Sequence, residues 1–262
     1  MRRKHPYGGR IMAEQIKNLA ITELQITGSQ EINHKKIKDS IKKFTHILKG
    51  AKSKENPELF RCYMEISDFS DELDVIIKRI ETELTSFTKN KEKVLNLWKK
   101  DKNDKSINRI LLKTLNSFIK IRLDIKDFFI HTRMFLDVVS RIIMISYGKR
   151  GMQLPDSMSK LLKNEKSLEI NKSFFKELRG KMNWYNDFVD EGRDLIVHKR
   201  GHLVFTNTKD GKFGFDILKH FDSKWGTETV NSIEDFIDKT LENLSEVLDY
   251  LTENLKFDIP NE

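Results

Sequence analysis

The chain has 262 residues, of which 38% are hydrophobic and 34% charged, and its formal net charge is +8. This length suits one large domain or two small ones, and the regular recurrence of apolar residues argues against a disordered chain. The single cysteine, Cys62, excludes an internal disulfide and a cysteine-rich metal site and fits the reducing cytoplasm, while no apolar run approaches the roughly 20 residues that a membrane span needs.

Charge and composition divide the chain into three predicted parts. Residues 1–11 are a basic, irregular extension, which we exclude from the fold. Residues 12–105 form a helical N-terminal region, and residues 106–262 form a second helical domain. The charged stretch KKDKNDKS at 99–106 is the best candidate for the loop between the two.

In the N-terminal region, apolar residues recur at helical spacing in two places. Residues 30–50 predict one helix. We interpret ELFRCYMEI at 58–66, just after Pro57, as a short strand or connector. Ser70 is followed by two acids, as is typical of a helix N-cap, and it predicts a second helix over about 71–99.

The second region begins with the most apolar part of the chain. A long helix is predicted over 121–148, where Gly148 marks its end. LPDSMSKLL begins a short helix with Asp156 or Ser157 as its cap. Another helix is predicted over 174–199.

The pattern then changes from helical spacing to alternation. Residues 202–218 alternate on both sides of Asp210-Gly211, a dipeptide typical of two-residue hairpin turns. Ser232 caps a closing helix predicted over 232–256. The predicted fold class is all-α: a bundle of helices with a β-hairpin inserted before the last helix.

Ionisable residues cluster near the end of the predicted helix 174–199, in the stretch DEGRDLIVHKR. Asp194 and His198 are four residues apart and share a helix face, and Arg193 lies beside them. A histidine exchanges protons near neutral pH, and an arginine stays charged and binds phosphate oxygens. In principle these two groups cleave RNA without a metal, because the imidazole removes the ribose 2′-OH proton and the guanidinium stabilises charge on the phosphate.

The stretch RDLIVH, from Arg193 to His198, resembles the R-x4-6-H motif of the HEPN (higher eukaryotes and prokaryotes nucleotide-binding) superfamily. In that family the arginine is commonly followed by Asn, Asp or His, and Asp194 fits. The order of a long apolar helix, a motif near a helix end and a closing helix is also similar. The likeness covers about residues 106–256 and identifies 106–262 as a HEPN-like helical domain.

The resemblance implies a metal-independent endoribonuclease, without a cofactor, of a toxin–antitoxin or phage-defence system. It implies a homodimer in which two motifs share one cleft, with RNA as the substrate and an antitoxin protein as a further partner. His198 would transfer the proton, Arg193 would bind the phosphate and Asp194 would orient the histidine. Residues expected to support the motif or to bind RNA are Asp127 or His131 on the preceding long helix, and Lys199 and Arg200 beside the motif.

Other interpretations stay open. Arg193 would pair with Asp190 one turn back, and His198 would stabilise the end of its helix. A non-catalytic HEPN-like module would bind RNA, a nucleotide or a protein partner, and a helical interaction protein would have no such site. Two carboxylate–histidine pairs with i,i+4 spacing would hold a metal if they met: Asp194 with His198, and Asp127 with His131.

Two lysine-rich stretches are further candidates for contact with RNA phosphates: HKKIKDSIKKF at 34–44 and KNKEKVLNLWKKDK at 89–102. The net charge of +8 suits such a partner. Acids interleave in both stretches, so a solvated helix face is the alternative. Trp184 and Tyr185, which have rings that could stack on bases, are expected in the core.

Overall fold

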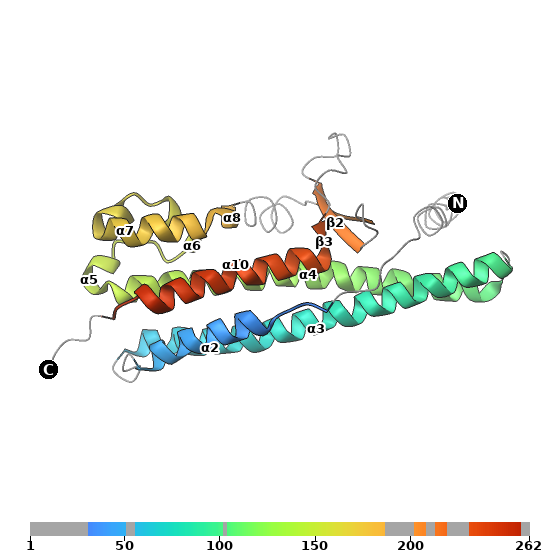
Figure 1. Ribbon diagram of the computed structural model, residues 1–262, viewed down its shortest axis with the longest axis horizontal. Helices are drawn as coiled ribbons and strands as arrows, with labels where there is room; N and C mark the ends of the chain where they lie inside the picture. The colour runs from blue at the N-terminus through green and yellow to red at the C-terminus, as the bar shows by residue number, and fades with distance from the viewer. Residues whose placement is uncertain are drawn as a thin grey trace, which may run out of the picture.

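Two long helices dominate the computed structural model, α3 (Pro57–Lys100) and α4 (Lys105–Ser146), which run antiparallel and pack together (Figure 1). The shorter α2 (Lys35–Gly50) packs against α3, and α10 (Ile233–Asn254) packs against α2. The predicted class, an all-α bundle with a hairpin before the last helix, is confirmed. The structure describes residues 31–50, 56–101, 104–186, 202–207, 213–218 and 231–257.

Helix α3 begins at Pro57, and the prediction for its first part was wrong. Residues 58–66 are its first turns, and Ser70 lies inside the helix instead of capping it. Proline fits the first turn, where its missing N–H leaves no bond unmade, and the N–H of Leu59 donates to Oδ1 of Asn56 at 3.0 Å. The buried positions keep helical spacing across the expected boundary: Leu59, Cys62, Ile66, Phe69, Leu73, Ile76 and Ile77.

Helix α4 starts at Lys105, well before the predicted residue 121. Asp104 caps it, because its carboxylate accepts the N–H of Ser106 at 2.7 Å. The charged stretch at 99–106 therefore contains the turn between the long helices, as expected. The predicted end is confirmed: the helix stops at Ser146, and Gly148 has a φ of 54°, a left-handed conformation that favours glycine.

Short helices follow α4 at one end of the bundle: α5 (Gly148–Gly151), α6 (Met158–Lys163), α7 (Lys166–Lys181) and α8 (Asn183–Asn186) (Figure 1). The hydroxyl of Ser157 does not cap α6; instead Asp137 of α4 accepts the N–H of Met158 at 2.9 Å. The helix predicted over 174–199 is divided between α7 and α8 as far as residue 186, and the rest of it lies outside the described residues.

The predicted hairpin is present as β1 (His202–Asn207) and β2 (Phe213–Leu218), and β3 (Asn231–Ser232) adds to it. The strands are antiparallel, with Phe205 opposite Phe215. The Asp210-Gly211 turn lies outside the described residues. The sheet packs on the bundle through aromatic side chains: Phe213 lies 4.5 Å from Phe87 of α3, and Phe215 lies 5.0 Å from Phe236 of α10, between ring centroids.

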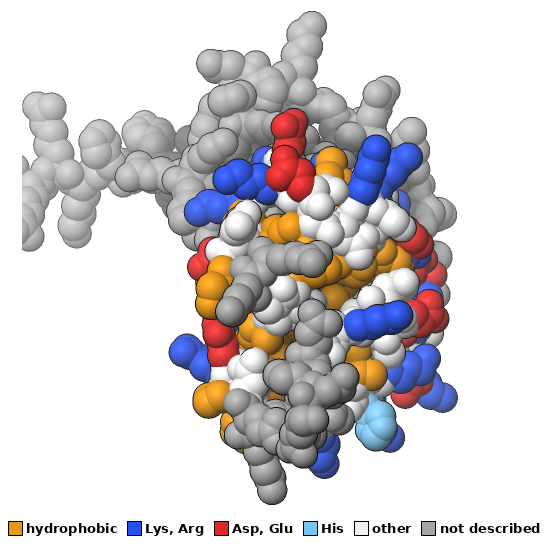
Figure 2. Space-filling view, turned by 90° about the vertical axis from the view of Figure 1, so that its left-hand side faces the viewer, with side chains coloured by type: hydrophobic (Ala, Val, Ile, Leu, Met, Phe, Trp, Pro, Cys, Tyr) orange, Lys and Arg blue, Asp and Glu red, His pale blue; other side chains and the backbone are white. Residues whose placement is uncertain are grey.

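One hydrophobic core joins the regions on both sides of the predicted boundary at 105–106. It contains Phe44 from α2, Ile77 from α3, Phe128 from α4 and Leu248 from α10, all fully buried. Figure 2 shows its hydrophobic side chains at one end of the bundle, with Lys, Arg, Asp and Glu around the rim. Across the described helices there is no apolar stretch of the length that a bilayer crossing requires.

Candidate functional site

The predicted motif lies in the connection between α8, which ends at Asn186, and β1, which begins at His202. The connection therefore leads from the short helices to the hairpin. The predicted site residues in it lie outside the described residues: Arg193, Asp194, His198, Lys199 and Arg200.

In α8, just before this connection, Tyr185 contacts a polar cluster on α4. Tyr185 is fully buried, as predicted, and its ring centroid lies 5.9 Å from Cζ of Arg133. The guanidinium donates to Asp137 at 3.0 Å and to Ser157 at 3.1 Å. Arg133 thus connects α4 to α6 and α8. The i,i+4 spacing of Arg133 and Asp137 beside a buried stripe is a sign of this cluster in the sequence that the prediction did not use.

The predicted supporting residues, Asp127 and His131, lie side by side on α4, on the side that faces α3. The Nδ1 atom of His131 lies 2.9 Å from the carbonyl oxygen of Asp127, and its Nε2 atom lies 3.3 Å from Glu72. Both ring nitrogens of His131 thus face oxygen atoms. The Asp127 carboxylate accepts a hydrogen bond from Arg79 at 2.9 Å. Both residues therefore take part in contacts between the long helices.

Arg79 of α3 contacts two carboxylates of α4. Besides Asp127, it donates to Asp124, whose side chain is only 7% exposed. Burial raises the pKa of Asp124, and the hydrogen bond from Arg79 opposes that rise. One turn farther along, Lys120 pairs with Glu83 at 2.6 Å.

These ion pairs line a groove between the long helices, with a volume of about 650 Å³. Its cations are matched by acids that they contact directly, so it offers little net charge to a ligand. Nowhere in the described part of the chain do three or more His, Cys, Asp or Glu side chains form a group suited to a metal. The metal site considered in the sequence also needs Asp194 and His198, which lie outside the described residues. The groove is lined by Val75, Lys78, Arg79, Thr82, Glu83, Lys120, Leu123, Asp124 and Asp127.

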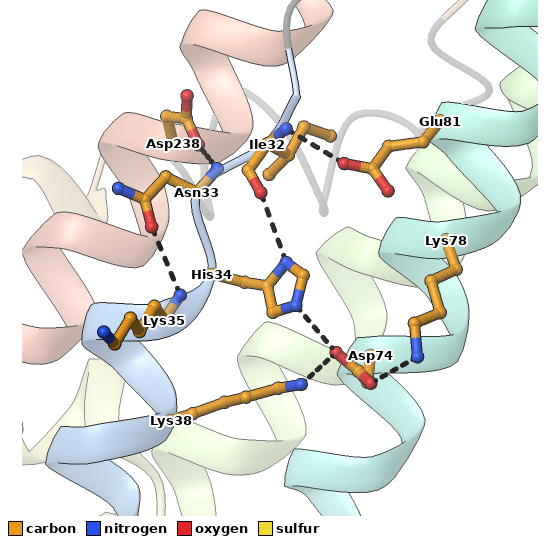
Figure 3. Close-up of polar contacts among 9 residues, drawn as sticks. All are labelled: Ile32, Asn33, His34, Lys35, Lys38, Asp74, Lys78, Glu81 and Asp238. Atoms are coloured by element: carbon orange, nitrogen blue, oxygen red, sulfur yellow. Dashed lines mark hydrogen bonds and ion pairs between the residues drawn. The ribbon is translucent and has the colours of Figure 1, made fainter.

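A second polar cluster fastens the start of α2 to α3 (Figure 3). His34 directs Nδ1 to the carbonyl oxygen of Ile32 at 3.2 Å and Nε2 to Asp74 at 3.2 Å. Asp74 also accepts from Lys38 of α2 and from Lys78 of α3. Although burial acts to raise it, these lysines hold the pKa of the Asp74 carboxyl below its usual value.

The residues just before α2 extend this attachment through the main chain. The N–H of Ile32 donates to Glu81 of α3 at 2.9 Å, and the N–H of Asn33 donates to Asp238 of α10 at 2.8 Å (Figure 3). Burial raises the pKa of Asp238, which the hydrogen bond from Asn33 opposes. The cluster thus joins α2 and the residues before it to α3 and α10.

Comparison with models of known protein families finds no match for this chain. Comparisons with characterised proteins and with solved structures likewise find no significant match.

Proposed function

We propose that this protein is a metal-independent endoribonuclease of the HEPN type, active as a homodimer and serving as a toxin or phage-defence component. The observation that carries the proposal is the spacing of Arg193, Asp194 and His198, placed between a helical bundle and a hairpin that precedes the closing helix. The net charge of +8 adds support, because RNA is a polyanion. An antitoxin that covers the site and a cytoplasmic location belong to the same proposal.

The proposed reaction is attack by a ribose 2′-oxygen on the adjacent phosphorus. His198 removes the 2′-OH proton, the P–O bond to the 5′-oxygen of the next nucleotide breaks, and a protonated histidine returns a proton to that oxygen. Arg193 binds the phosphate, where negative charge builds in the transition state. Asp194 orients the imidazole. The products carry a 2′,3′-cyclic phosphate and a 5′-hydroxyl, which can be distinguished from the ends left by hydrolysis.

Asp127 and His131 are proposed to support the site, but both also contribute to the contact between α3 and α4. Both are bonded across to α3, through Arg79 and Glu72. Replacing either one therefore weakens the contact between α3 and α4 as well. Activity of such variants has to be compared at equal folded fraction.

The test is incubation of the purified protein with total RNA in excess EDTA. We expect cleavage with 5′-hydroxyl ends, reduced about 10²- to 10⁴-fold by His198→Ala, the range for loss of a general acid–base group. Arg193→Gln should reduce it by roughly 10²-fold or more, as for loss of a transition-state donor. His46→Ala is the matched control, because His46 is exposed on α2, and it should cleave like the unaltered protein.

Three results would contradict the proposal in different ways. Intact RNA together with salt-sensitive binding would show a non-catalytic RNA-binding module. Intact RNA with no binding at any salt concentration would indicate a helical interaction protein. Cleavage that EDTA abolishes would reject the metal-independent mechanism.

A further inference from the structure

The tip of the α3–α4 pair carries a strong excess of positive over negative charge. We define the arm as residues 88–117, which lie beyond Phe87 and Phe118, the residues that contact Phe213 of the hairpin. In the sequence the arm holds nine Lys or Arg and three Asp or Glu, a net charge of +6 compared with +8 for the whole chain. Figure 1 shows α3 and α4 continuing past the start of α10 and past α2 at this end.

Seven of the described cations of the arm are exposed to solvent, and an eighth, Lys91, is buried. None of the seven named below forms an ion pair with another residue that the structure describes. An isolated two-helix tip has few neighbouring acids, so these charges stay uncompensated. The exposed cations are Lys89, Lys93, Lys99, Lys100, Lys105, Arg109 and Lys113.

Most of these cations lie in two rows that face the same side of the arm. Lys89, Lys93 and Lys100 are four and seven residues apart on α3 and therefore share a helix face. The same spacing continues back to Lys78, which lines the groove between the long helices. On α4, the row of Lys105, Arg109 and Lys113 leads in the same way to Lys120 of that groove. The α3 row of the arm spans about 16 Å at 1.5 Å per residue.

The arm is held together without these cations. Val94 of α3 is 5% exposed and Ile107 of α4 is 3% exposed. Lysines that are not needed for packing and have no acidic partner repel one another, which costs the folded state some stability. Their arrangement is explained by a polyanionic ligand that offsets this repulsion.

We propose that the arm binds the phosphate backbone of RNA along these two rows. The inference rests on the proposed function for the identity of the polyanion, and it places RNA contact far from the motif connection in sequence. Linear rows of cations suit a linear chain of phosphates. A membrane-surface helix requires a broad apolar face that enters the lipid. In the arm, Val94 and Ile107 are buried between α3 and α4, and Leu112 is the one large apolar side chain among the described residues of the arm that is exposed. The cation rows are therefore not backed by a broad apolar face.

The test compares two triple variants that remove the same charge from opposite ends of the molecule. One is Lys89→Gln, Lys93→Gln and Lys100→Gln in the arm. The other replaces Lys166, Lys172 and Lys176 of α7 by Gln. These three lysines are also exposed, and they lie in the short helices at the end where Figure 2 shows Lys, Arg, Asp and Glu interleaved. Both variants carry His198→Ala, so that cleavage does not consume the probe.

Binding is measured by fluorescence anisotropy of a labelled single-stranded RNA between about 50 and about 200 mM salt. We expect the arm variant to weaken binding at least about tenfold at low salt. The slope of log K against log salt should fall in magnitude by about 2, or about 0.7 for each lost phosphate contact. The α7 variant should keep the affinity and slope of its parent chain.

Equal binding by both variants would overturn the inference about the arm and leave the proposed cleavage untouched. If RNA binding depends on the arm but the protein never cleaves RNA, the inference about the arm is supported and the proposed endoribonuclease activity is rejected. Failure of the parent chain to bind RNA, with arm-dependent binding to vesicles rich in anionic lipid, would overturn the inference in favour of a membrane surface.

Discussion

Helix α2 and the arm are both rich in lysine, but lysines of α2 form ion pairs with neighbouring helices, whereas the exposed lysines of the arm form none within the described residues. On α2, Lys36 pairs with Glu242 at 3.5 Å, Lys43 with Asp249 at 3.8 Å, and Lys38 with Asp74. The seven exposed cations of the arm have no ion pair within the described residues. The same kind of sequence thus joins helices in one place and extends into solvent in the other.

This contrast shows that charge composition alone does not identify a binding surface. The partners of the α2 lysines come from α3 and α10, which lie next to α2 in space but far from it in sequence. The acids that interleave with lysines in the arm are too few to neutralise them. A basic helix becomes a candidate for nucleic acid binding only when no neighbouring helix supplies its counter-charges.

The largest change in the free energy of unfolding should come from a core residue of α2, because α2 is held by core packing and the arm has few buried residues. Phe44 of α2 is fully buried, and Phe44→Ala should lower the free energy of unfolding by about 4 kcal/mol. Val94→Ala in the arm removes two methyl groups and should cost roughly 1.5 kcal/mol. Chemical denaturation of both variants measures the difference, and equal losses would mean that the arm shares the core as fully as α2 does.

A smaller effect should come from the ion pairs that fasten α2. Asp74→Asn removes the charge that His34, Lys38 and Lys78 contact and should cost about 1 kcal/mol, as for a partly exposed network. The folded protein lowers the pKa of Asp74, so its contribution is present above the pKa of the unfolded chain and is lost as the pH falls through the folded value.

Thermal unfolding from about pH 6 down to about pH 3 tests this sign, because an unperturbed Asp titrates near pH 4. The stability difference between the parent chain and Asp74→Asn should shrink as the pH falls through that range. A difference that stays constant with pH would show that the carboxylate charge does not hold α2 in place.

The smallest effect should come from the arm lysines themselves. Replacing Lys89, Lys93 and Lys100 by Gln removes no ion pair within the described residues, so the free energy of unfolding should change by less than about 0.5 kcal/mol. Relief of repulsion favours a slight gain over a loss. A clear loss in calorimetry would show that these lysines support the fold, and it would weaken the contrast with α2.

Several features of the fold could be predicted because they depend on local signals. Ser232 accepts the N–H of Asp235 at 3.0 Å and starts α10 as its sequence indicates. The alternation at 202–218 forms two antiparallel strands. The division at Ser70 failed because a serine followed by acids is also compatible with a helix interior, and only packing against α4 and α2 shows that α3 continues through it.

The candidate site shows the same limit. The spacing from Arg193 to His198 can be read from the sequence, and it supports a proposal about chemistry. The residues that contact Asp127 and His131 could not be predicted from the sequence, because Arg79 and Glu72 belong to a different helix. In the cluster around Arg133, the contact with Asp137 could be expected from their i,i+4 spacing, but those with Ser157 and Tyr185 could not, because these two residues come from other parts of the chain.

The helical class, the break between helices within 99–106, the paired strands of the hairpin and the cap of α10 could all be inferred from the sequence, because spacing, capping and turn preferences act within a few residues of one another. Only the tertiary structure decided which lysines find acids and which do not. Ion pairs form between helices that the shared hydrophobic core brings together, and that pairing cannot be read from neighbours along the chain.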